Sequence, residues 1–281
     1  MLNDQVILLT GCSAGIGHAL ALELAQRGNR VFASARKLDG LKDLEGEPNI
    51  EIVQLDVTDL ASMERAVAEV VKRAGRVDVL VNNAGFNLIG PLAEVPLDGV
   101  RRLFETNVTG PLALIQMVFP HMAERRSGRI VNVGSVVGLL PTPFAGPYCA
   151  TKAAVHMLSE VLRMELTPFG IEVVVVQPGG VRSGLADAAA QDLARYAAPS
   201  SRYHRAYAGI EKRARASQDR PMESSAFARE IAAAILAVRA PRVVRAGRGA
   251  RLYPALSRVP APLRDRLLMR NFGLEQLKAR E

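Results

Sequence analysis

The stretch Thr10-Gly11-Cys12-Ser13-Ala14-Gly15-Ile16-Gly17 follows directly on a short apolar run, Val6–Leu9. From Gly15 to Arg27 apolar residues recur at helical spacing, and Gly28 ends that pattern. The order is therefore strand, glycine-rich turn and helix. Glycines permit a tight turn and let backbone N–H groups approach a phosphate at the positive end of the helix. The stretch predicts a phosphate-binding loop in an α/β fold.

Beyond this loop the chain alternates between short β-branched runs and helical patterns of ten residues or more. A continuous apolar run such as Val173–Val176 is typical of a strand that is buried on both faces, as in a parallel sheet covered by helices. We predict a doubly wound, Rossmann-type parallel sheet in a single domain. The predicted strands are Val6–Thr10, Arg30–Ala35, Ile50–Leu55, Val77–Val81, Arg129–Val133 and Ile171–Gln177.

Long helices are predicted over Leu97–Arg125 and Pro147–Thr167, where apolar residues recur at positions i, i+3, i+4 and i+7. A further helix is expected from Ser224 or Ser225 to about Val238. The polar, arginine-dotted residues 183–223 are interpreted as a substrate lid inserted in the catalytic domain, which we place at residues 1–250. Residues 251–281 form a basic, amphipathic C-terminal extension.

Composition excludes several classes of protein. The 281 residues are 49% hydrophobic, which excludes a mainly disordered chain. Two cysteines cannot form a disulfide framework, and the N-terminus lacks the basic and apolar regions of a secretory signal, so we expect a cytoplasmic protein. No apolar stretch approaches the roughly 18 residues of a spanning helix. The four histidines show no metal-ligand spacing, and no metal is expected.

The net charge of +8 is concentrated at the C-terminal end. Residues 241–281 contain 10 Lys or Arg and 3 Asp or Glu, whereas residues 1–240 are nearly balanced. Groove binding would require a basic face built into the fold, so we expect no nucleic acid as a partner. The basic surplus instead suggests a surface contact or a solvated terminus.

Further motifs follow in order, and together with the glycine-rich loop they resemble the short-chain dehydrogenase/reductase family, whose loop reads Thr-Gly-x-x-x-Gly-x-Gly. The resemblance covers nearly all of residues 5–183, with serine at position 183 in place of the usual threonine. Within the family, the chain looks most like 17β-hydroxysteroid dehydrogenase-like and acyl-dihydroxyacetone-phosphate reductase-like enzymes. The motifs are Asp56-Val57, Asn82-Asn83-Ala84-Gly85, Asn107, Ser135, Tyr148-x-x-x-Lys152 and Pro178-Gly179 with Ser183.

The resemblance implies a nicotinamide dinucleotide and a set of residues that bind it. Asn107, Ser135, Tyr148 and Lys152 are the implied catalytic residues. Asn107 would position a water that links Lys152 to solvent, and Lys152 would also bind the nicotinamide ribose. The expected cofactor-binding residues are Gly11, Ser13, Gly15, Ile16, Gly17, Arg36, Lys37, Asp56, Val57, Asn83, Ala84, Gly85, Tyr148, Lys152, Pro178, Gly179, Val181 and Ser183.

The pair Tyr148 and Lys152 also has a chemical reason of its own. Side chains four residues apart share one face of a helix. An isolated phenol has a pKa near 10, and a neighbouring ammonium would lower that pKa. Tyr148 would then exchange a proton with the substrate oxygen as a general acid, and Ser135 would hold the same oxygen. Considered one at a time, these residues have ordinary structural alternatives: Tyr148 and Lys152 suit a solvated helix face, and Ser135 suits a turn at the end of a strand.

The end of the second predicted strand indicates which dinucleotide is used. A carboxylate there would select NAD by accepting bonds from the ribose 2′-hydroxyl, whereas an arginine would pair with the 2′-phosphate of NADP. The sequence Ala35-Arg36-Lys37 contains no acid, and Arg36 with Lys37 and Ser13 suits a phosphate. We expect NADPH/NADP⁺, the alternative being that Arg36 is a plain surface residue.

The expected reaction is hydride transfer from NADPH to the carbonyl of a bulky, lipophilic ketone. Phe144, Leu139, Leu140 and Pro143 are candidates for an apolar substrate pocket, or for the core. Cys12 and Cys149 are read as small packing residues that confer sensitivity to thiol reagents. The alternative functions are an NAD-linked hydroxysteroid or alcohol dehydrogenase and a catalytically silent NADPH-binding regulator.

Two features concern partners. The C-terminal extension mixes leucines with arginines, which suits either peripheral contact with anionic lipid or a flap over the substrate cleft or a partner subunit; we favour the flap. The family resemblance implies a homodimer or homotetramer packed through the helices that carry Asn107 and Tyr148.

Overall fold

The computed structural model describes residues 1–184 and 193–277. Seven strands form one parallel sheet in the order β3-β2-β1-β4-β5-β6-β7. The predicted doubly wound fold is confirmed. The strands are β1 (Val6–Leu9), β2 (Arg30–Ala35), β3 (Ile50–Gln54), β4 (Val79–Asn82), β5 (Gly128–Val133), β6 (Ile171–Pro178) and β7 (Val243–Ala246).

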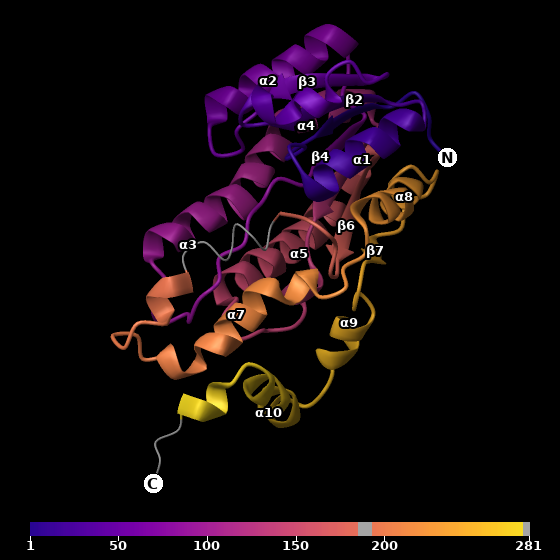
Figure 1. Ribbon diagram of the computed structural model, residues 1–281. Coiled ribbons are helices and arrows are strands. Elements are labelled where there is room, and N and C mark those ends of the chain that lie inside the picture. Colours follow the sequence, from indigo (N-terminus) through magenta and orange to yellow (C-terminus); the bar gives the residue numbers. More distant parts are fainter. Residues whose placement is uncertain (185–192, 278–281) are drawn as a thin grey trace.

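Helices cover both faces of this sheet (Figure 1). On one face, α1 (Gly15–Gln26) packs against α8 (Ser224–Ile235). The other face carries α2 (Leu60–Ala74), α4 (Gly110–Arg125) and α5 (Gly146–Leu166). The strand order reverses between β1 and β4, and in such folds ligands bind at the carboxyl ends of the strands beside this point.

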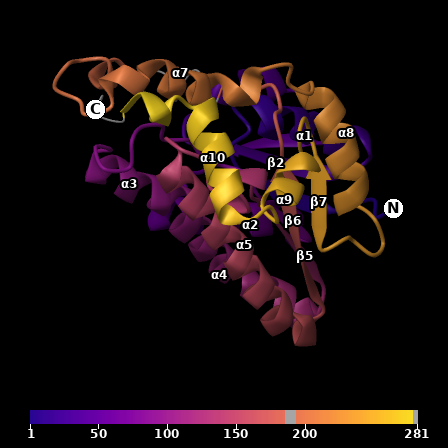
Figure 2. The ribbon, with the colours of Figure 1, turned by 90° about the horizontal axis from the view of Figure 1, so that it is seen from below.

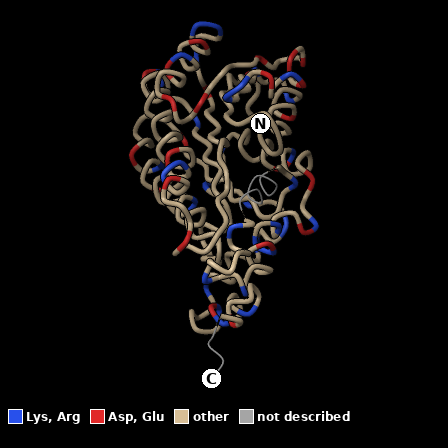
Figure 3. Tube along the Cα trace, turned by 60° about the vertical axis from the view of Figure 1, so that its left-hand side comes forward, with Lys and Arg blue, Asp and Glu red and all other residues tan. Residues whose placement is uncertain are grey.

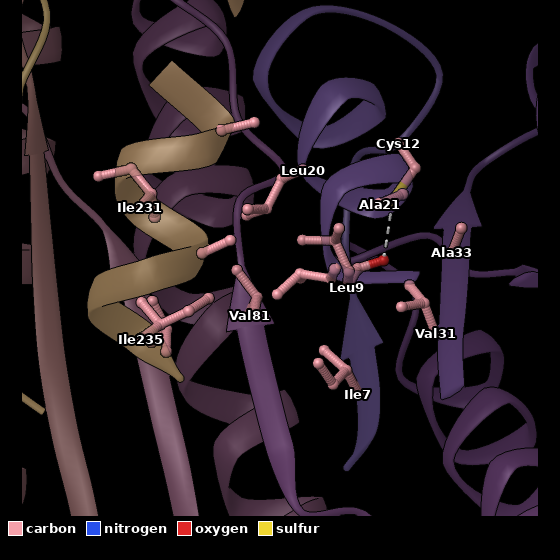
Figure 4. Close-up of a cluster of buried hydrophobic side chains, with 14 of the residues drawn as sticks. Ile7, Leu9, Cys12, Leu20, Ala21, Val31, Ala33, Val81, Ile231 and Ile235 are labelled. Carbon is pink, nitrogen blue, oxygen red and sulfur yellow. Dashed lines mark hydrogen bonds between the residues drawn. The ribbon is translucent and has the colours of Figure 1, made fainter. Parts of the chain in front are cut away.

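Each face of the sheet has its own apolar core. Ile7 and Leu9 of β1 point to one side and pack with Leu20 of α1 and Ile231 of α8 (Figure 4). Leu8 points to the other side and packs with the cluster under α2 and α4. All of β1 is buried, which explains why it reads as an uninterrupted apolar run.

The predicted helix over residues 97–125 is continuous but not uniform. It consists of α3 (Leu97–Phe104), a π-helical turn (Glu105–Thr109) and α4. Gly110 begins α4 where a Cβ would overlap the carbonyl oxygen of Val57. The π-helical turn contains Asn107, and such turns are frequent at functional sites.

The seventh strand is absent from the sequence prediction. It has only four residues and carries Arg245, so its apolar signal is weak. Val243–Ala246 pairs in parallel with Val175–Pro178 and thereby completes the sheet at the β6 edge. Its pairing follows from the free edge of β6 and not from a local pattern.

The predicted lid, residues 183–223, is described at residues 183–184 and 193–223, whereas residues 185–192 lie outside the described part. The described part holds α7 (Tyr207–Arg215) and short 3₁₀ turns at Leu193–Tyr196, His204–Ala206 and Ala216–Gln218. The extension forms α9 (Leu252–Leu256), α10 (Ala261–Asn271) and a turn at Leu274–Leu277, and it runs beneath α7 (Figures 1 and 2). Residues 278–281 lie outside the described part. The boundaries at 250 and 251 remain predictions.

Charges of both signs are spread over the body of the molecule (Figure 3). In the described part of the extension, α10 lies at one end of the molecule next to α7 (Figures 1 and 2). Within the described residues, no helix combines the length and apolarity needed to cross a membrane.

Candidate active site

The loops that leave β1, β4, β5 and β6 meet at the carboxyl edge of the sheet, because all these strands run in parallel. A Cβ built on Gly15, in the loop after β1, would lie 3.0 Å from the Cβ of Ser183, in the loop after β6. Segments far apart in sequence are thus in contact here. The sheet brings the sequence-predicted motifs to one edge.

The glycine-rich turn has the geometry of a phosphate cradle. Gly11 and Gly15 adopt left-handed backbone angles (φ +73° and +61°), which side chains rarely allow. A Cβ at Gly17 would overlap the carbonyl oxygen of Gly11. Helix α1 begins after Ala14 without a side-chain cap and without an acidic residue in its first turn. Its first N–H groups are therefore available to an anion, and the loop fits a dinucleotide.

Asn83 and Thr10 join this loop to the turn after β4. The Asn83 Nδ2 donates to the carbonyls of Thr10 (2.9 Å) and Gly11 (3.1 Å). The Thr10 Oγ1 in turn accepts the N–H groups of Asn83 and Ala84, each at 3.0 Å. These bonds fix the backbone between Asn83 and Gly85, so Asn83 acts on the cradle by positioning it.

Arg36 and Lys37 follow the end of β2 and are exposed. Within the described part of the chain, neither side chain forms an ion pair. The nearest acid in sequence, Asp39, pairs with Lys42 at 3.0 Å. Ser13 lies beside the same segment, since a Cβ on Gly40 would come within 3.0 Å of its Cβ. The structure thus leaves two cations and a hydroxyl near the place expected for the adenosine ribose.

Asp56 and Val57 occupy the turn after β3. The Asp56 Oδ1 accepts bonds from the Thr58 N–H (2.9 Å) and hydroxyl (2.8 Å). The Asp56 N–H donates to Ser62 Oγ at 3.1 Å. One carboxylate oxygen is therefore committed to shaping the turn, and the buried Val57 packs beneath it.

Tyr148 and Lys152 share one face of α5, as their spacing predicts. The Lys152 Nζ lies 5.6 Å from the centre of the Tyr148 ring. It donates a hydrogen bond to the carbonyl of Val133 at 2.8 Å, and the residue is buried. Lys152 is therefore held between the end of β5 and the phenol.

The sequence predicts that Lys152 lowers the pKa of Tyr148. This expectation is wrong, because the surrounding protein raises that pKa. Burial raises the pKa of Tyr148 to about 12, against smaller opposing effects from the charge of Arg213 and a hydrogen bond from Ser135. Burial also lowers the pKa of Lys152 to about 8, because the charged ammonium loses its hydration. At neutral pH the phenol therefore keeps its proton.

Ser135 is positioned by a residue that the sequence analysis missed. Its hydroxyl accepts the N–H of Val137 at 3.3 Å, and its own N–H donates to His156 Nε2 at 3.4 Å. Burial is the largest cause that lowers the pKa of His156, to about 4, so the ring stays neutral and can accept. A Cβ at Gly134 would overlap this ring. The only signal for His156 in the sequence is that it follows Lys152 by four residues and so lies on the same face of the helix.

Asn107 is buried and fully engaged. Its Oδ1 accepts the N–H of Phe86 at 3.1 Å, while its Nδ2 donates to the Phe86 carbonyl (3.0 Å) and to Thr151 Oγ1 (3.3 Å). A Cβ on Gly85 would lie 3.0 Å from the same Oδ1. Asn107 therefore fixes the strand-end turn against α5, and its role toward a water remains a prediction.

The loop after β6 closes the opposite side of the site. The N–H of Gly179 donates to Ala246 O at 2.9 Å, so Pro178-Gly179 is anchored to β7. Gln218 binds this loop from the lid, donating to Val181 O at 3.1 Å and accepting from Ser183 N–H at 3.4 Å. Val181 and Ser183 are thus fixed between the cradle and the lid.

Apolar residues of the lid and extension cover the region beyond Tyr148. Phe144 is 5% exposed and packs edge-on against Tyr203 and Phe272, with ring centres 6.2 and 6.5 Å apart. Phe144 therefore serves the packing of the lid, and Leu140 is likewise buried. Leu139 and Pro143 are only partly buried, so their expected role in lining the substrate pocket stays a prediction.

The two cysteines differ in accessibility. Cys12 is fully buried, donates to Leu9 O at 3.2 Å (Figure 4), and burial raises its pKa to about 12. It packs as expected, but the expected reactivity is wrong for this thiol because the reactive thiolate is suppressed. Cys149 is partly buried and lies 3.2 Å from Thr142 Oγ1.

Comparison with known proteins gives the class to which this site belongs. Residues 5–194 match the family model for short chain dehydrogenases. The chain belongs to the short-chain dehydrogenase/reductase family, an oxidoreductase family that binds NAD(P). This confirms the family indicated by the sequence motifs.

The individual relatives agree with this family. A 3-ketodihydrosphingosine reductase of Bacteroides thetaiotaomicron is 36% identical over 66% of this chain and 67% of its own length. Human 17-beta-hydroxysteroid dehydrogenase type 1 is 40% identical over 63% of this chain and 57% of its own. The crystal structure of a short-chain dehydrogenase from Streptomyces avermitilis covers 98% of both chains, with a TM-score of 0.78 and 31% identity. The chain thus spans only about three fifths of the length of the human relative. The motifs quoted from this chain all lie within residues 5–194, which match the family model.

Proposed function

We propose that this protein reduces the carbonyl of a bulky, lipophilic ketone to a secondary alcohol with NADPH. One observation carries the proposal: the buried Lys152 lies against the Tyr148 ring at the sheet edge that also holds the phosphate cradle. The dinucleotide supplies the hydride when it is bound. The protein has to hold the carbonyl and provide a proton to its oxygen.

Tyr148 is the proposed proton donor. Because burial raises its pKa to about 12, the phenol is protonated at neutral pH and available to donate as negative charge develops on the carbonyl oxygen. Ser135 would hold the same oxygen through a hydrogen bond. Lys152, by the family resemblance, would bind the nicotinamide ribose hydroxyls, and Asn107 would link it through water to solvent.

NADPH is proposed in place of NADH because of the cations after β2. Arg36 and Lys37 are exposed and unpaired within the described residues, and no carboxylate occupies the position that would accept the ribose 2′-hydroxyl. A guanidinium binds phosphate through parallel, charge-assisted hydrogen bonds. Both residues are therefore available to a 2′-phosphate.

A lipophilic substrate is supported by the apolar side chains that the lid buries, among them Leu193, Tyr196 and Ile210, and by the names of two relatives, a 3-ketodihydrosphingosine reductase and a 17-beta-hydroxysteroid dehydrogenase. Phe272 of the extension is 5% exposed against Phe144, which supports the proposed flap over the cleft rather than a lipid anchor. We further propose a homodimer or homotetramer. A cytoplasmic location is proposed because both cysteines are free.

The test is loss of NADPH absorbance across a panel of ketones. We expect turnover of apolar ketones and a loss of about 10² to 10⁴-fold in kcat for Tyr148→Phe. The matched control is Tyr203→Phe, which removes a hydroxyl from the lid and should retain activity. Turnover restricted to small polar carbonyls, or an active Tyr148→Phe enzyme, would refute the proposal.

A further inference from the structure

The lid contains a buried cation that the proposed chemistry does not use. Arg213 belongs to α7 and is only 6% exposed, although arginine is almost never this buried without a partner. On the same helix, Ile210 and Ala214 pack into the apolar cluster that also includes Phe144. The Arg213 side chain is therefore almost wholly buried, and its Nε is among the buried atoms.

Arg213 has no partner among the residues that the structure describes. Its Nε is buried without a hydrogen-bond acceptor, and the side chain forms no ion pair in that part of the chain. The acidic residues nearest to Arg213 in the sequence form ion pairs with other arginines: Glu211 lies 3.8 Å from Arg215, and Asp219 lies 2.7 Å from Arg248. An isolated buried charge is costly, so the site favours an anion.

The helix that carries Arg213 packs beside the proposed proton donor, because its Ile210 and Ala214 belong to the apolar cluster against which Cys149, the residue after Tyr148, is packed. The positive charge of Arg213 favours the phenolate of Tyr148 and opposes the rise in the pKa of that residue. The end of α7 is also tied to the site, because Gln218, three residues beyond Arg215, binds Val181 and Ser183 in the loop after β6. Arg213 is therefore part of the substrate side of the active site.

The extension holds α7 in this position. Lys212 Nζ donates to Asn271 Oδ1 at 2.7 Å and to its carbonyl at 3.1 Å. Gly209 lies so close to Phe272 that a Cβ would overlap the Phe272 carbonyl oxygen. Two residues that precede Arg213 on α7 are thus held by the extension, which preorganises the position of the Arg213 side chain.

We propose that Arg213 binds an anionic group of the substrate, so that the preferred substrates are lipophilic ketones that carry a carboxylate. This inference rests on the proposed function and specifies its substrate class. A planar carboxylate matches the guanidinium fork and would neutralise the buried charge next to the reacting carbonyl. A phosphate of the dinucleotide has the same chemistry, and the experiment separates these two sources.

The experiment compares oxodecanoates, with the ketone at successive carbons, with their methyl esters, which have the same carbonyl but no charge. For the wild-type enzyme we expect kcat/KM of the best oxo acid to exceed that of its ester by at least about tenfold, as one charge-assisted hydrogen bond supplies. In Arg213→Met the acid-to-ester ratio should fall to about one, and Arg213→Lys should restore part of it. Arg215→Met, an exposed arginine on the same helix, is the matched control.

Three results would overturn the inference. The first is a wild-type enzyme that does not discriminate between acid and ester. The second is an increased KM for NADPH in Arg213→Met, which would assign the guanidinium to the dinucleotide. The third is an unchanged acid-to-ester ratio with a shifted pH profile, which would assign Arg213 to Tyr148 alone.

A binding measurement separates this inference from the proposed reaction. Calorimetric titration with octanoate and with octanol should show binding of octanoate that Arg213→Met weakens by about tenfold or more, and no such difference for octanol. If the enzyme reduces no ketone but this difference is present, the proposed function fails and the anion site stands. If ketones are reduced but octanoate binds both variants equally, only the anion site fails.

Discussion

The Lys152 ammonium nitrogen lies 5.6 Å from the centre of the Tyr148 ring; Lys152 is buried, and Tyr148 is partly buried against Val136, Val137 and Ala250. Burial acts on them in opposite directions: it raises the pKa of the phenol to about 12 and lowers that of the ammonium to about 8. Each shift favours the neutral form. The pair therefore meets a substrate with a protonated phenol and an ammonium that is easily deprotonated.

The pKa of Lys152 predicts a pH dependence of stability. Between pH 8 and the ordinary value of 10.5, the unfolded chain binds this proton and the folded chain does not, so the contribution of Lys152 to stability rises with pH there and is lost as pH falls through 8. Relative to Lys152→Met, the wild-type free energy of unfolding should increase by up to about 3 kcal/mol from pH 8 to 10.5. Guanidinium unfolding at both pH values measures this. The exposed Lys72→Met is the control, and a constant difference between wild type and Lys152→Met would contradict the assigned shift.

Reversing the charge after β2 should change the dinucleotide preference. Arg36→Asp removes a phosphate-binding cation and adds a carboxylate that can accept bonds from a ribose 2′-hydroxyl. The ratio of kcat/KM for NADPH to that for NADH should fall by about tenfold to a hundredfold, as expected for a lost charge-assisted contact. Arg101→Asp, an exposed site on α3, is the control. An unchanged ratio would show that Arg36 does not contact the cofactor.

Adding one methyl group at Gly209 should separate the lid from the extension. The new Cβ of Gly209→Ala would overlap the carbonyl oxygen of Phe272, so α7 or the extension must shift. We expect a loss of about 1 to 3 kcal/mol in stability and an increased KM for the ketone, with little change in the KM for NADPH. Thermal unfolding and steady-state kinetics measure both. The control is Ala208→Gly, at the exposed residue beside Gly209. If the two variants had the same KM for the ketone and the same stability, the proposed flap would be contradicted.

The outer face of α5 is the proposed subunit contact. Met157, Val161 and Met164 lie on one side of the helix at helical spacing and are 67%, 39% and 58% exposed. Placing a charge in such a patch should prevent burial of apolar surface between subunits. We expect Met164→Glu to sediment at a lower mass than the wild type at equal concentration. Lys72→Glu is the control; a wild type that sediments as a monomer would exclude the contact.

Local pattern was sufficient for most of the fold, because the central strands are buried on both faces and read as apolar runs. Val6–Leu9 and Ile171–Pro178 were found in this way. The four residues of β7 were missed because their pairing depends on the exposed edge of β6. The π-helical turn at Glu105–Thr109 was missed for a similar reason, since it is a change in hydrogen bonding within a continuous helical pattern.

The sequence by itself determined the chemistry available at the site: a glycine turn, a phenol and an amine four residues apart, and a cation after the second strand. Only the tertiary structure decided which groups lie together and which protons they keep. The N–H of Ser135 donates to His156, and the charge of Arg213 acts on Tyr148, although no sequence spacing encodes either relationship. The physical reason is that desolvation and the distance between charges depend on segments distant in sequence, and these two quantities set the pKa values and the unpaired charge.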